Sequence, residues 1–302
     1  MSTPLRIGIE IGGTKQQLVA GDAEGNIIDR CRFSVDSGGG GPVIRERIAE
    51  ELPALIATHK PERIGVGFGG PVDIAKGTVA VSHQVEGWSG FPLREWLHDL
   101  TGLPVVIEND ANTAALAEAL RGAGRGFNPA FYINMGSGVG GGLVIDGKIY
   151  HGAAPGEVEV GHLRLDADGA TVEDRCSGWA VDHAIREAIA DVSDCPLAKL
   201  ISDTEGSEAQ HLAAALAQND SIAQTILNTV TSDLAFALSH VTHLFHPEAI
   251  TLGGGLALIG EPLRKGIADT LPEFLMEIYD NGPQIKLTEL REDAVPVGAL
   301  LL

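Results

Sequence analysis

Short apolar runs, separated by glycine and polar turn residues, dominate the first part of the chain. Residues 5–11 are mostly apolar, Gly12-Gly13-Thr14 interrupts them, and a second apolar run follows at 17–20. A polar turn at 22–25 then leads into a third run at 26–35. Runs of this length bounded by such turns are typical of β-strands joined as hairpins. The pattern therefore predicts an antiparallel opening to a sheet.

The same pattern recurs far later in the chain. Strands are expected at 131–135, 143–145 and 148–150, with a glycine-rich loop at 136–142 and a tight Asp146-Gly147 turn before the last strand. Two copies of strand, glycine loop, strand, turn and strand indicate a duplicated α/β architecture.

Helical spacing of apolar residues occurs between and after these strands. The segments 43–60, 113–121 and 222–245 carry it, and each is predicted to be an amphipathic helix. Asn112 precedes the second of these helices and is expected to be its N-cap. The remaining expected elements are strands at 64–68, 105–107 and 249–252 and helices at 91–101 and 262–271.

The length of the chain bears on its division into domains. At 302 residues it exceeds the usual size of one domain, so we expect two lobes with a cleft between them. We place a small α/β lobe at 1–112, completed by a segment at about 288–302, and a large α/β lobe at 113–287.

Composition and charge exclude several classes of partner. A net charge of −20 would repel a nucleic-acid backbone and an anionic membrane, and 5% aromatic residues leave few platforms for stacking bases. Cys31, Cys176 and Cys195 lie far apart, which argues against a disulfide framework. The N-terminal segment lacks the apolar region of a signal peptide, and no apolar run approaches the length of a membrane span. We expect a cytoplasmic protein that binds neither nucleic acid nor membranes.

The glycine loops suggest a site for a polyanion. Residues 136–141 match GxGxxG, but a hairpin follows where a dinucleotide-binding fold needs a helix, and no GxxxxGK[ST] motif occurs. Backbone N–H groups of Gly12-Gly13-Thr14 and of Gly136–Gly140 could approach phosphates, with the hydroxyls of Thr14 and Ser137 as further donors. Alternatively, these glycines only permit tight turns. Gly253-Gly254-Gly255 could pack against an adenine ring or form a strand-to-helix turn without a ligand.

Asp110 is the candidate base. It follows a buried strand and precedes a helix, the position where open α/β sheets present site residues. A carboxylate there can accept the proton of a sugar hydroxyl that attacks phosphorus. The alternative is that Asp110 and Asn109 cap the following helix.

A second polar group could bind sugar hydroxyls. It consists of Glu157, Glu159, His162 and Glu173, whose side chains can hold diols by paired hydrogen bonds. A solvated hairpin face is the alternative for Glu157. His162 with the lone Cys176 is too sparse a set for structural zinc.

Seven motifs in order resemble the ROK family of sugar kinases and repressors, within the actin/hexokinase-like superfamily. They are IEIGGTK (9–15), GFGGPVD (67–73), ENDANTAALAE (108–118), MGSGVGGG (135–142), EVGH (159–162), VEDRCSGWA (172–180) and LGGGLA (252–257). The likeness covers essentially the whole chain. It implies a duplicated ribonuclease H-like fold with nucleotide and sugar in the cleft between the lobes.

The resemblance also implies roles for individual residues. Asp110 would be the catalytic base, and the sugar would contact Asn109, Glu159, His162, Glu173 and Gly70. The phosphates would contact Gly12, Gly13, Thr14 and Lys15 together with Gly136, Ser137 and Gly138, while Gly254 and Gly255 would lie near adenosine. ATP and Mg²⁺ are the implied cofactors, the 6-hydroxyl of glucose is the first acceptor to expect, and the protein would be a homodimer.

Three departures from the family pattern qualify this reading. Glu10 stands where the family has an aspartate expected to act on Mg²⁺ through water, and Mg²⁺ is strict about geometry. The interval 163–172 lacks the family's zinc-binding cysteines, so we expect no zinc. The first strand is predicted to begin at Leu5, so we expect this protein to lack the helix-turn-helix domain that family repressors carry.

Alternative functions remain open at this point. The phosphoryl donor could be polyphosphate, the acceptor could be an N-acetylhexosamine, or the protein could bind sugar without catalysis. Glu10 is the feature that favours the last of these.

Overall fold

The computed structural model describes residues 4–13, 15–34, 39–82, 85–154, 158–201, 206–280 and 282–302. Thr14 and Glu157, two of the candidate residues, lie outside the described residues. The chain forms two compact units. The first comprises Met1–Gly122, Gly142–Val158 and Glu292–Leu302, and the second comprises Ala123–Gly141 and Glu159–Arg291. The lobe boundaries expected from the sequence remain a prediction.

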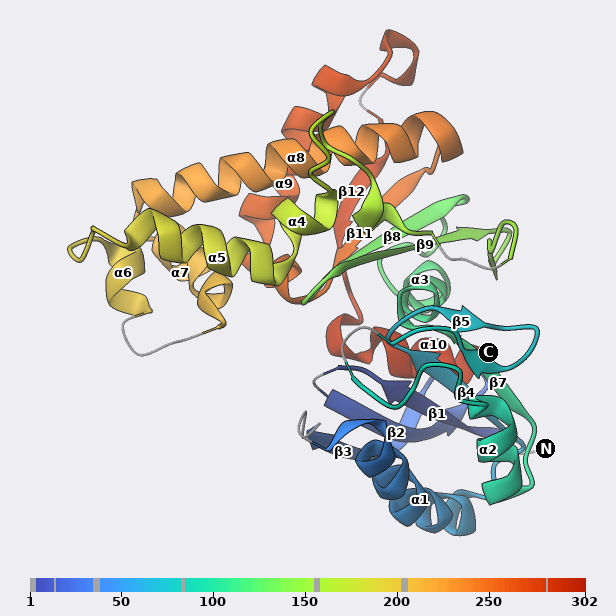
Figure 1. Cartoon of the computed structure of the whole chain (residues 1–302). Helices are drawn as coiled ribbons and strands as arrows, with labels where there is room; N and C mark the ends of the chain where they lie inside the picture. The colour runs from blue at the N-terminus through green and yellow to red at the C-terminus, as the bar shows by residue number, and fades with distance from the viewer. Residues whose placement is uncertain are drawn as a thin grey trace. The chain divides into compact units, whose positions relative to one another are not determined.

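A five-stranded sheet forms the centre of the first unit (Figure 1). Its order is β3-β2-β1-β4-β7, with β1 antiparallel to β2 and parallel to β4. The strands are β1 (Leu5–Ile11), β2 (Lys15–Asp22), β3 (Ile27–Ser34), β4 (Arg63–Phe68) and β7 (Val105–Asn109), and a separate pair is formed by β5 (Val72–Asp73) and β6 (Thr78–Val79). The hairpins predicted for the start of the chain are confirmed.

A second five-stranded sheet has the order β10-β9-β8-β11-β12. Its strands are β8 (Ala130–Met135), β9 (Val139–Ile145), β10 (Lys148–Ile149), β11 (Ala249–Gly253) and β12 (Gln284–Leu287). The two sheets share one spatial order. If the five strands of a sheet are numbered as they occur along the chain, their order across the sheet is 3-2-1-4-5 in both cases. This repeated order confirms the duplicated α/β architecture predicted from the two glycine-loop patterns.

Helices cover both faces of the first sheet (Figure 1). On one face, α1 (Gly40–His59) and α2 (Leu93–Thr101) pack against alternate strand residues. The fully or almost fully buried members of this core include Ile7, Ile9, Ile48, Leu52, Ile64, Val66 and Leu97. On the other face lies α10 (Ala294–Leu301), next to α3 (Asp110–Arg121). Because side chains alternate along a strand, odd and even positions of β1 meet different helices.

Two glycines let α10 approach the sheet at backbone distance. Gly8 of β1 and Gly65 of β4 are paired in register. A Cβ atom on Gly65 would lie 1.9 Å from the carbonyl oxygen of Ala299, and one on Gly8 would lie 2.8 Å from that of Pro296. Glycine in a strand often marks such an approach of another backbone.

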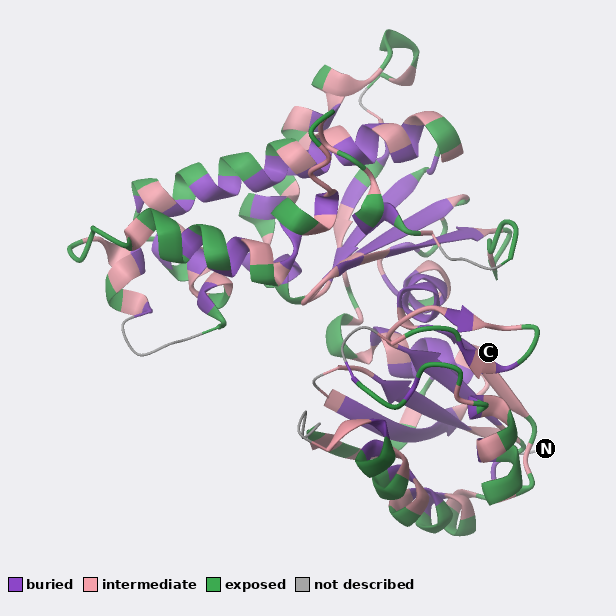
Figure 2. Ribbon diagram, in the orientation of Figure 1, coloured by how far each residue is buried: buried purple, intermediate pink, exposed green. Residues whose placement is uncertain are grey.

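The second unit is built around α8 (Ser221–Phe245), whose N-cap Asp220 accepts hydrogen bonds from the N–H groups of Ile222 and Ala223. Buried and exposed stretches alternate along this helix, as an amphipathic pattern requires (Figure 2). The other helices are α4 (Val172–Cys176), α5 (Gly178–Ile189), α6 (Pro196–Leu200), α7 (Leu212–Leu216) and α9 (Glu261–Thr270). Short 3₁₀ turns are η1 (Val160–His162), η2 (Glu208–His211), η3 (Gly255–Ile259), η4 (Leu271–Phe274), η5 (Glu277–Tyr279) and η6 (Arg291–Asp293).

Among the described residues, no helix has both the length and the apolar character needed to cross a bilayer.

Replacing Gly65 with alanine should destabilise the protein strongly. The added Cβ would overlap the backbone of Ala299, which cannot move without displacing α10. We expect a loss of about 3 kcal/mol or more in unfolding free energy, measured by thermal unfolding. Gly255→Ala is the matched control, because a Cβ there meets no atom within 4 Å. A Gly65→Ala protein as stable as this control would contradict the packing.

Candidate functional site

The candidate residues fall into two groups, one in each unit. The first group surrounds the junction between β7 and α3. Asn109 is the N-cap of α3, with φ −66° and ψ 147°, and its Oδ1 accepts a hydrogen bond from the backbone N–H of Asn112 at 3.0 Å. The prediction that Asn112 caps the helix is therefore wrong. The helix begins at Asp110, before the apolar spacing that marked Thr113 as its start.

Asp110 lies beside the glycine turns of the first sheet. Its Oδ1 accepts hydrogen bonds from the backbone N–H of Ala111 at 2.8 Å and from the side chain of Asn109 at 3.3 Å. A Cβ on Gly69, just after β4, would lie 3.5 Å from Oδ2 of Asp110 and 3.5 Å from the Cα of Gly12. The structure thus brings the candidate base and the first glycine loop together.

Asn109 and Gly70, both expected to contact the sugar, are direct neighbours. The side-chain amide of Asn109 donates to the carbonyl oxygen of Gly70 at 3.2 Å. Between β1 and β2, the N–H of Gly12 donates to the carbonyl of Lys15 at 3.3 Å and closes the turn. Gly13 is half-buried in the same turn.

Glu10, the residue that departs from the family pattern, is buried on β1 with 7% of its surface exposed. Its Oε2 accepts a hydrogen bond from the side chain of Gln17 at 2.7 Å, and Nζ of Lys15 lies 3.8 Å from Oε1. Burial raises the pKa of the Glu10 carboxyl, while the charge of Lys15 and the hydrogen bond from Gln17 act in the opposite direction.

Gln17 links Glu10 to a network that the sequence did not reveal. Its side chain is 1% exposed, and its Oε1 accepts hydrogen bonds from Arg30 at 3.0 Å and from Arg32 at 2.7 Å. Arg30 in turn pairs with Asp293, and Arg32 with Glu292, just before α10. No local signal in the sequence indicates this network, because the acidic partners of Arg30 and Arg32 lie at the other end of the chain.

The second group begins with the turn between β8 and β9. The N–H of Gly136 donates to the carbonyl of Gly138 at 2.9 Å, and the carbonyl of Gly136 accepts from the N–H of Gly178 at 2.7 Å. Ser137 is half-buried between the two glycines. Because β9 begins at Val139, the loop is shorter than the predicted 136–142. The later glycines belong to the strand, where glycine was mistaken for a loop signal.

Glu173 belongs to this glycine turn. Its Oε2 accepts a hydrogen bond from the N–H of Val139 at 2.8 Å, and a Cβ on Gly138 would lie 2.5 Å from the same oxygen. Its backbone carbonyl accepts from the N–H of Ser177, the residue that caps α5. The carboxylate therefore fixes the turn from one side.

Glu159 and His162 form a separate exposed pair at η1. The N–H of His162 donates to the carbonyl of Glu159 at 3.1 Å, and both residues are exposed.

Gly254, with φ +81°, lies against the backbone of Met135. A Cβ atom on Gly254 would be 2.4 Å from the carbonyl carbon of Met135. Gly254 thus lies beside the start of the glycine turn, and Gly255 faces open space.

The described ranges also bear on metal binding. Within them, no three His, Cys, Asp or Glu side chains lie where they could share a metal ion. Cys176 is fully buried, and burial raises the pKa of its thiol to about 12. Because a thiolate is the form that binds metal, this cysteine is a poor ligand. The expectation that zinc is lacking stays a prediction.

Comparison with known proteins identifies the family. The sequence model of the ROK family matches residues 6–302. The chain belongs to the ROK family. A glucokinase of Halalkalibacterium halodurans is 30% identical to this ROK protein over 312 residues, which span 99% of this chain and 94% of the relative. The Escherichia coli DNA-binding transcriptional repressor Mlc is 28% identical over 271 residues, which span 85% of this chain and 65% of that protein.

A solved structure extends the comparison to the ROK fold. The ROK glucokinase of Streptomyces griseus, in complex with glucose and AMPPNP, superposes with a TM-score of 0.83 at 29% identity and covers 98% of each chain. This likeness confirms the actin/hexokinase-like fold class predicted from the ordered motifs. Because ROK relatives include a repressor as well as kinases, family membership alone does not decide the activity.

The raised pKa of Glu10 predicts a specific pH dependence of stability. A carboxyl whose pKa rises on folding favours the folded state below its unfolded pKa, near 4.5, and this contribution is lost as the pH rises through the folded value. Glu10→Gln cannot titrate, so its unfolding free energy should rise relative to the native protein as the pH increases from 4.5. Thermal unfolding of both proteins across a pH series measures this. Parallel curves would contradict the assignment.

Proposed function

We propose that this ROK protein is an ATP-dependent sugar kinase that transfers the γ-phosphoryl group to the 6-hydroxyl of glucose or a related hexose. The observation that carries the proposal is the position of Asp110, whose carboxylate lies beside Gly69 and Gly12 at the ends of neighbouring strands. The glucokinase relative and the glucose and AMPPNP complex of a similar protein support the substrate pair.

Asp110 would act as the base. Two hydrogen bonds, from Ala111 and Asn109, hold its Oδ1 and fix the plane of the carboxylate. The carboxylate would accept the proton of the attacking sugar hydroxyl. At the same time the sugar oxygen would bond to the γ-phosphorus, and the bond from that phosphorus to the leaving oxygen of ADP would break. A positioned base contributes about 10² to 10⁴ in rate, and orientation and charge stabilisation contribute much of the remainder.

The residues beside Asp110 suit a nucleotide with its metal ion. Mg²⁺ usually keeps several waters and takes one or two carboxylates in addition to phosphate oxygens. Glu10 offers one buried carboxylate next to the Gly12 turn, and Lys15 offers a partly exposed ammonium. Mg²⁺, when bound, would neutralise charge on the phosphates. Glu10 would orient its water ligands, and Lys15 and the turn would bind phosphate oxygens.

The remaining roles follow the family resemblance. We assign sugar contacts to Asn109, Gly70, Glu159, His162 and Glu173. The turn at Gly136, Ser137 and Gly138 would bind phosphate, and Gly254 and Gly255 would lie near adenosine. The hydrogen bond from Val139 to Glu173 supports a shared role for this carboxylate in shaping the phosphate turn.

The test is a coupled assay of ADP release with ATP, Mg²⁺ and a panel of glucose, mannose, fructose and N-acetylhexosamines. We expect turnover with at least one hexose and the highest kcat/KM with glucose. A parallel reaction with polyphosphate in place of ATP identifies the donor. Calorimetric binding of a sugar without turnover under any of these conditions would refute the kinase proposal in favour of a non-catalytic sugar-binding protein.

A further inference from the structure

Glu108 is a buried carboxylate that the proposed chemistry does not use. It lies on β7, two positions before Asp110, and only 3% of its surface is exposed. A buried charge is tolerated only where hydrogen bonds replace the water it has lost. The donors that approach Glu108 come from the strand end, from the first turn of α3 and from the segment that follows β10.

One oxygen of Glu108 holds both ends of the first turn of α3. Its Oε1 accepts hydrogen bonds from the backbone N–H of Asn109 at 2.9 Å and from the side-chain amide of Asn112 at 3.1 Å. Asn112 is fully buried, and its own backbone N–H donates to the side chain of Asn109 at 3.0 Å. Asp110 lies between these two asparagines, so Glu108 restrains the backbone from which the candidate base projects.

The other oxygen of Glu108 pairs with a histidine. Nε2 of His151 lies 2.6 Å from Oε2 of Glu108. This distance is short for a hydrogen bond between nitrogen and oxygen, as is usual where the acceptor is a carboxylate. The side chain of His151 is 40% exposed, in contrast to its partner. The segment that carries it is held in turn, because the N–H of Tyr150 donates to the carbonyl of Leu143 at 2.8 Å.

We propose that His151 and Glu108 are positioning residues for Asp110, an inference that rests on the proposed kinase function. His151 binds Oε2 and thereby fixes the orientation of the Glu108 carboxylate. In that orientation, Oε1 meets the donors of Asn109 and Asn112 and locks the first turn of α3. Without His151, the carboxylate can turn toward water and the turn loosens. A displacement of about 1 Å at a reacting group can cost on the order of 10² in rate.

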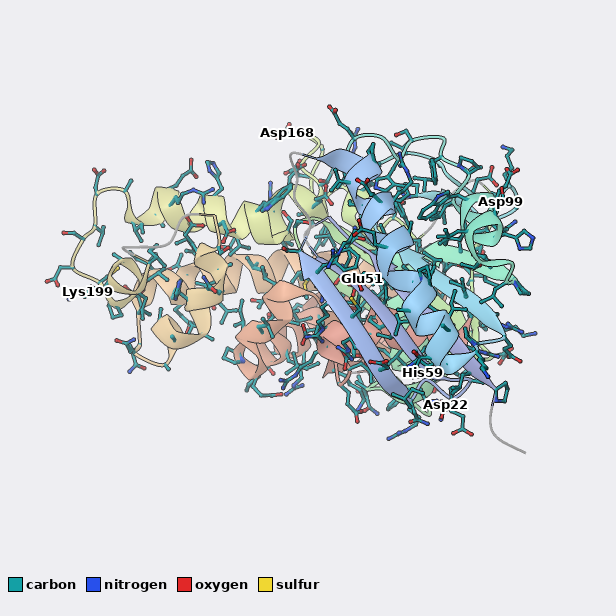
Figure 3. The ribbon with its side chains drawn as sticks, turned by 90° about the horizontal axis from the view of Figure 1, so that it is seen from below. Asp22, Glu51, His59, Asp99, Asp168 and Lys199 are labelled. Carbon is teal, nitrogen blue, oxygen red and sulfur yellow. The ribbon has the colours of Figure 1, made fainter. Side chains whose placement is uncertain are left out.

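Because the side chain of His151 is partly exposed, an effect on the position of Asp110 can be distinguished from a loss of stability. Removing a half-exposed side chain opens no cavity in the core, so the loss of stability should be small. The effect should instead appear in kcat. A second histidine–carboxylate pair in the same unit provides the comparison. His59 lies at the end of α1 (Figure 3), and its Nε2 is 2.8 Å from Oδ2 of Asp29 on β3.

The experiment compares His151→Ala, His151→Gln and the matched control His59→Ala. We expect His151→Ala to lower kcat at least tenfold while changing the KM for the sugar less than threefold and the Tm by only a few degrees. The glutamine variant should recover kcat to within about threefold of the native protein, because its amide nitrogen can take the place of Nε2 as the donor. His59→Ala should leave kcat unchanged.

A second measurement does not depend on activity. Hydrogen exchange of the Asn109 backbone amide, followed by NMR, should accelerate in His151→Ala but remain slow in His151→Gln and His59→Ala. If the native protein turns over no sugar while exchange behaves in this way, the proposed function fails and the restraint at the strand end stands. Two results would overturn the positioning role. One is an unchanged exchange rate of the Asn109 amide in His151→Ala, and the other is faster exchange in this variant while its kcat equals that of the native protein.

Discussion

The capped first turn of α3 is the feature on which the candidate residues of the first unit depend. Asn109 closes this turn by accepting the N–H of Asn112, and Asp110 projects from it with one oxygen held by the N–H of Ala111. The same turn binds Gly70 through the side chain of Asn109. Direct hydrogen bonds thereby connect the end of β7, the turn at Gly70 and the carboxylate of Asp110.

The packing beneath this turn follows from alternation along β1 and β4. Isoleucine and valine point to α1 and α2, while Gly8 and Gly65 point to α10. One face gains stability by burying apolar side chains, and the other gains it by close contact between backbones. The candidate base is attached to this packed platform, because α10 also packs against α3.

Much of this fold could be predicted from the sequence because its signals are local. Hairpin turns, short apolar runs and helical spacing indicated nine of the twelve strands and five of the ten α-helices in the described part of the chain, and their repetition indicated the duplication. The assignment of Asn112 as the N-cap of α3 is wrong because the apolar spacing begins at Thr113, whereas the helix begins at Asp110. The position of α10 could not be derived from periodicity, since six of its eight residues are buried and it lacks a polar face that would orient it.

The candidate site was predictable to a lesser extent. Ordered motifs singled out Asp110, and the structure shows that Gly12 and Gly69 lie beside it. Sequence reasoning did not find the partners of Glu10 or Glu108, because these pairs depend on strand register and on segments far apart in the chain. Both carboxylates are buried, and their hydrogen-bond partners decide what they can do.

The most direct test of the central claim is the Asp110→Asn variant, in which Oδ1 can still accept the N–H of Ala111. The account predicts that phosphorylation of the preferred hexose slows by about 10² to 10⁴, while calorimetry shows sugar binding within a few fold of the native protein. Asp99→Asn, on the exposed face of α2 in Figure 3, should behave as the native protein does. An Asp110→Asn protein that keeps its rate, or that loses binding and rate equally, would contradict the role of Asp110 as the base.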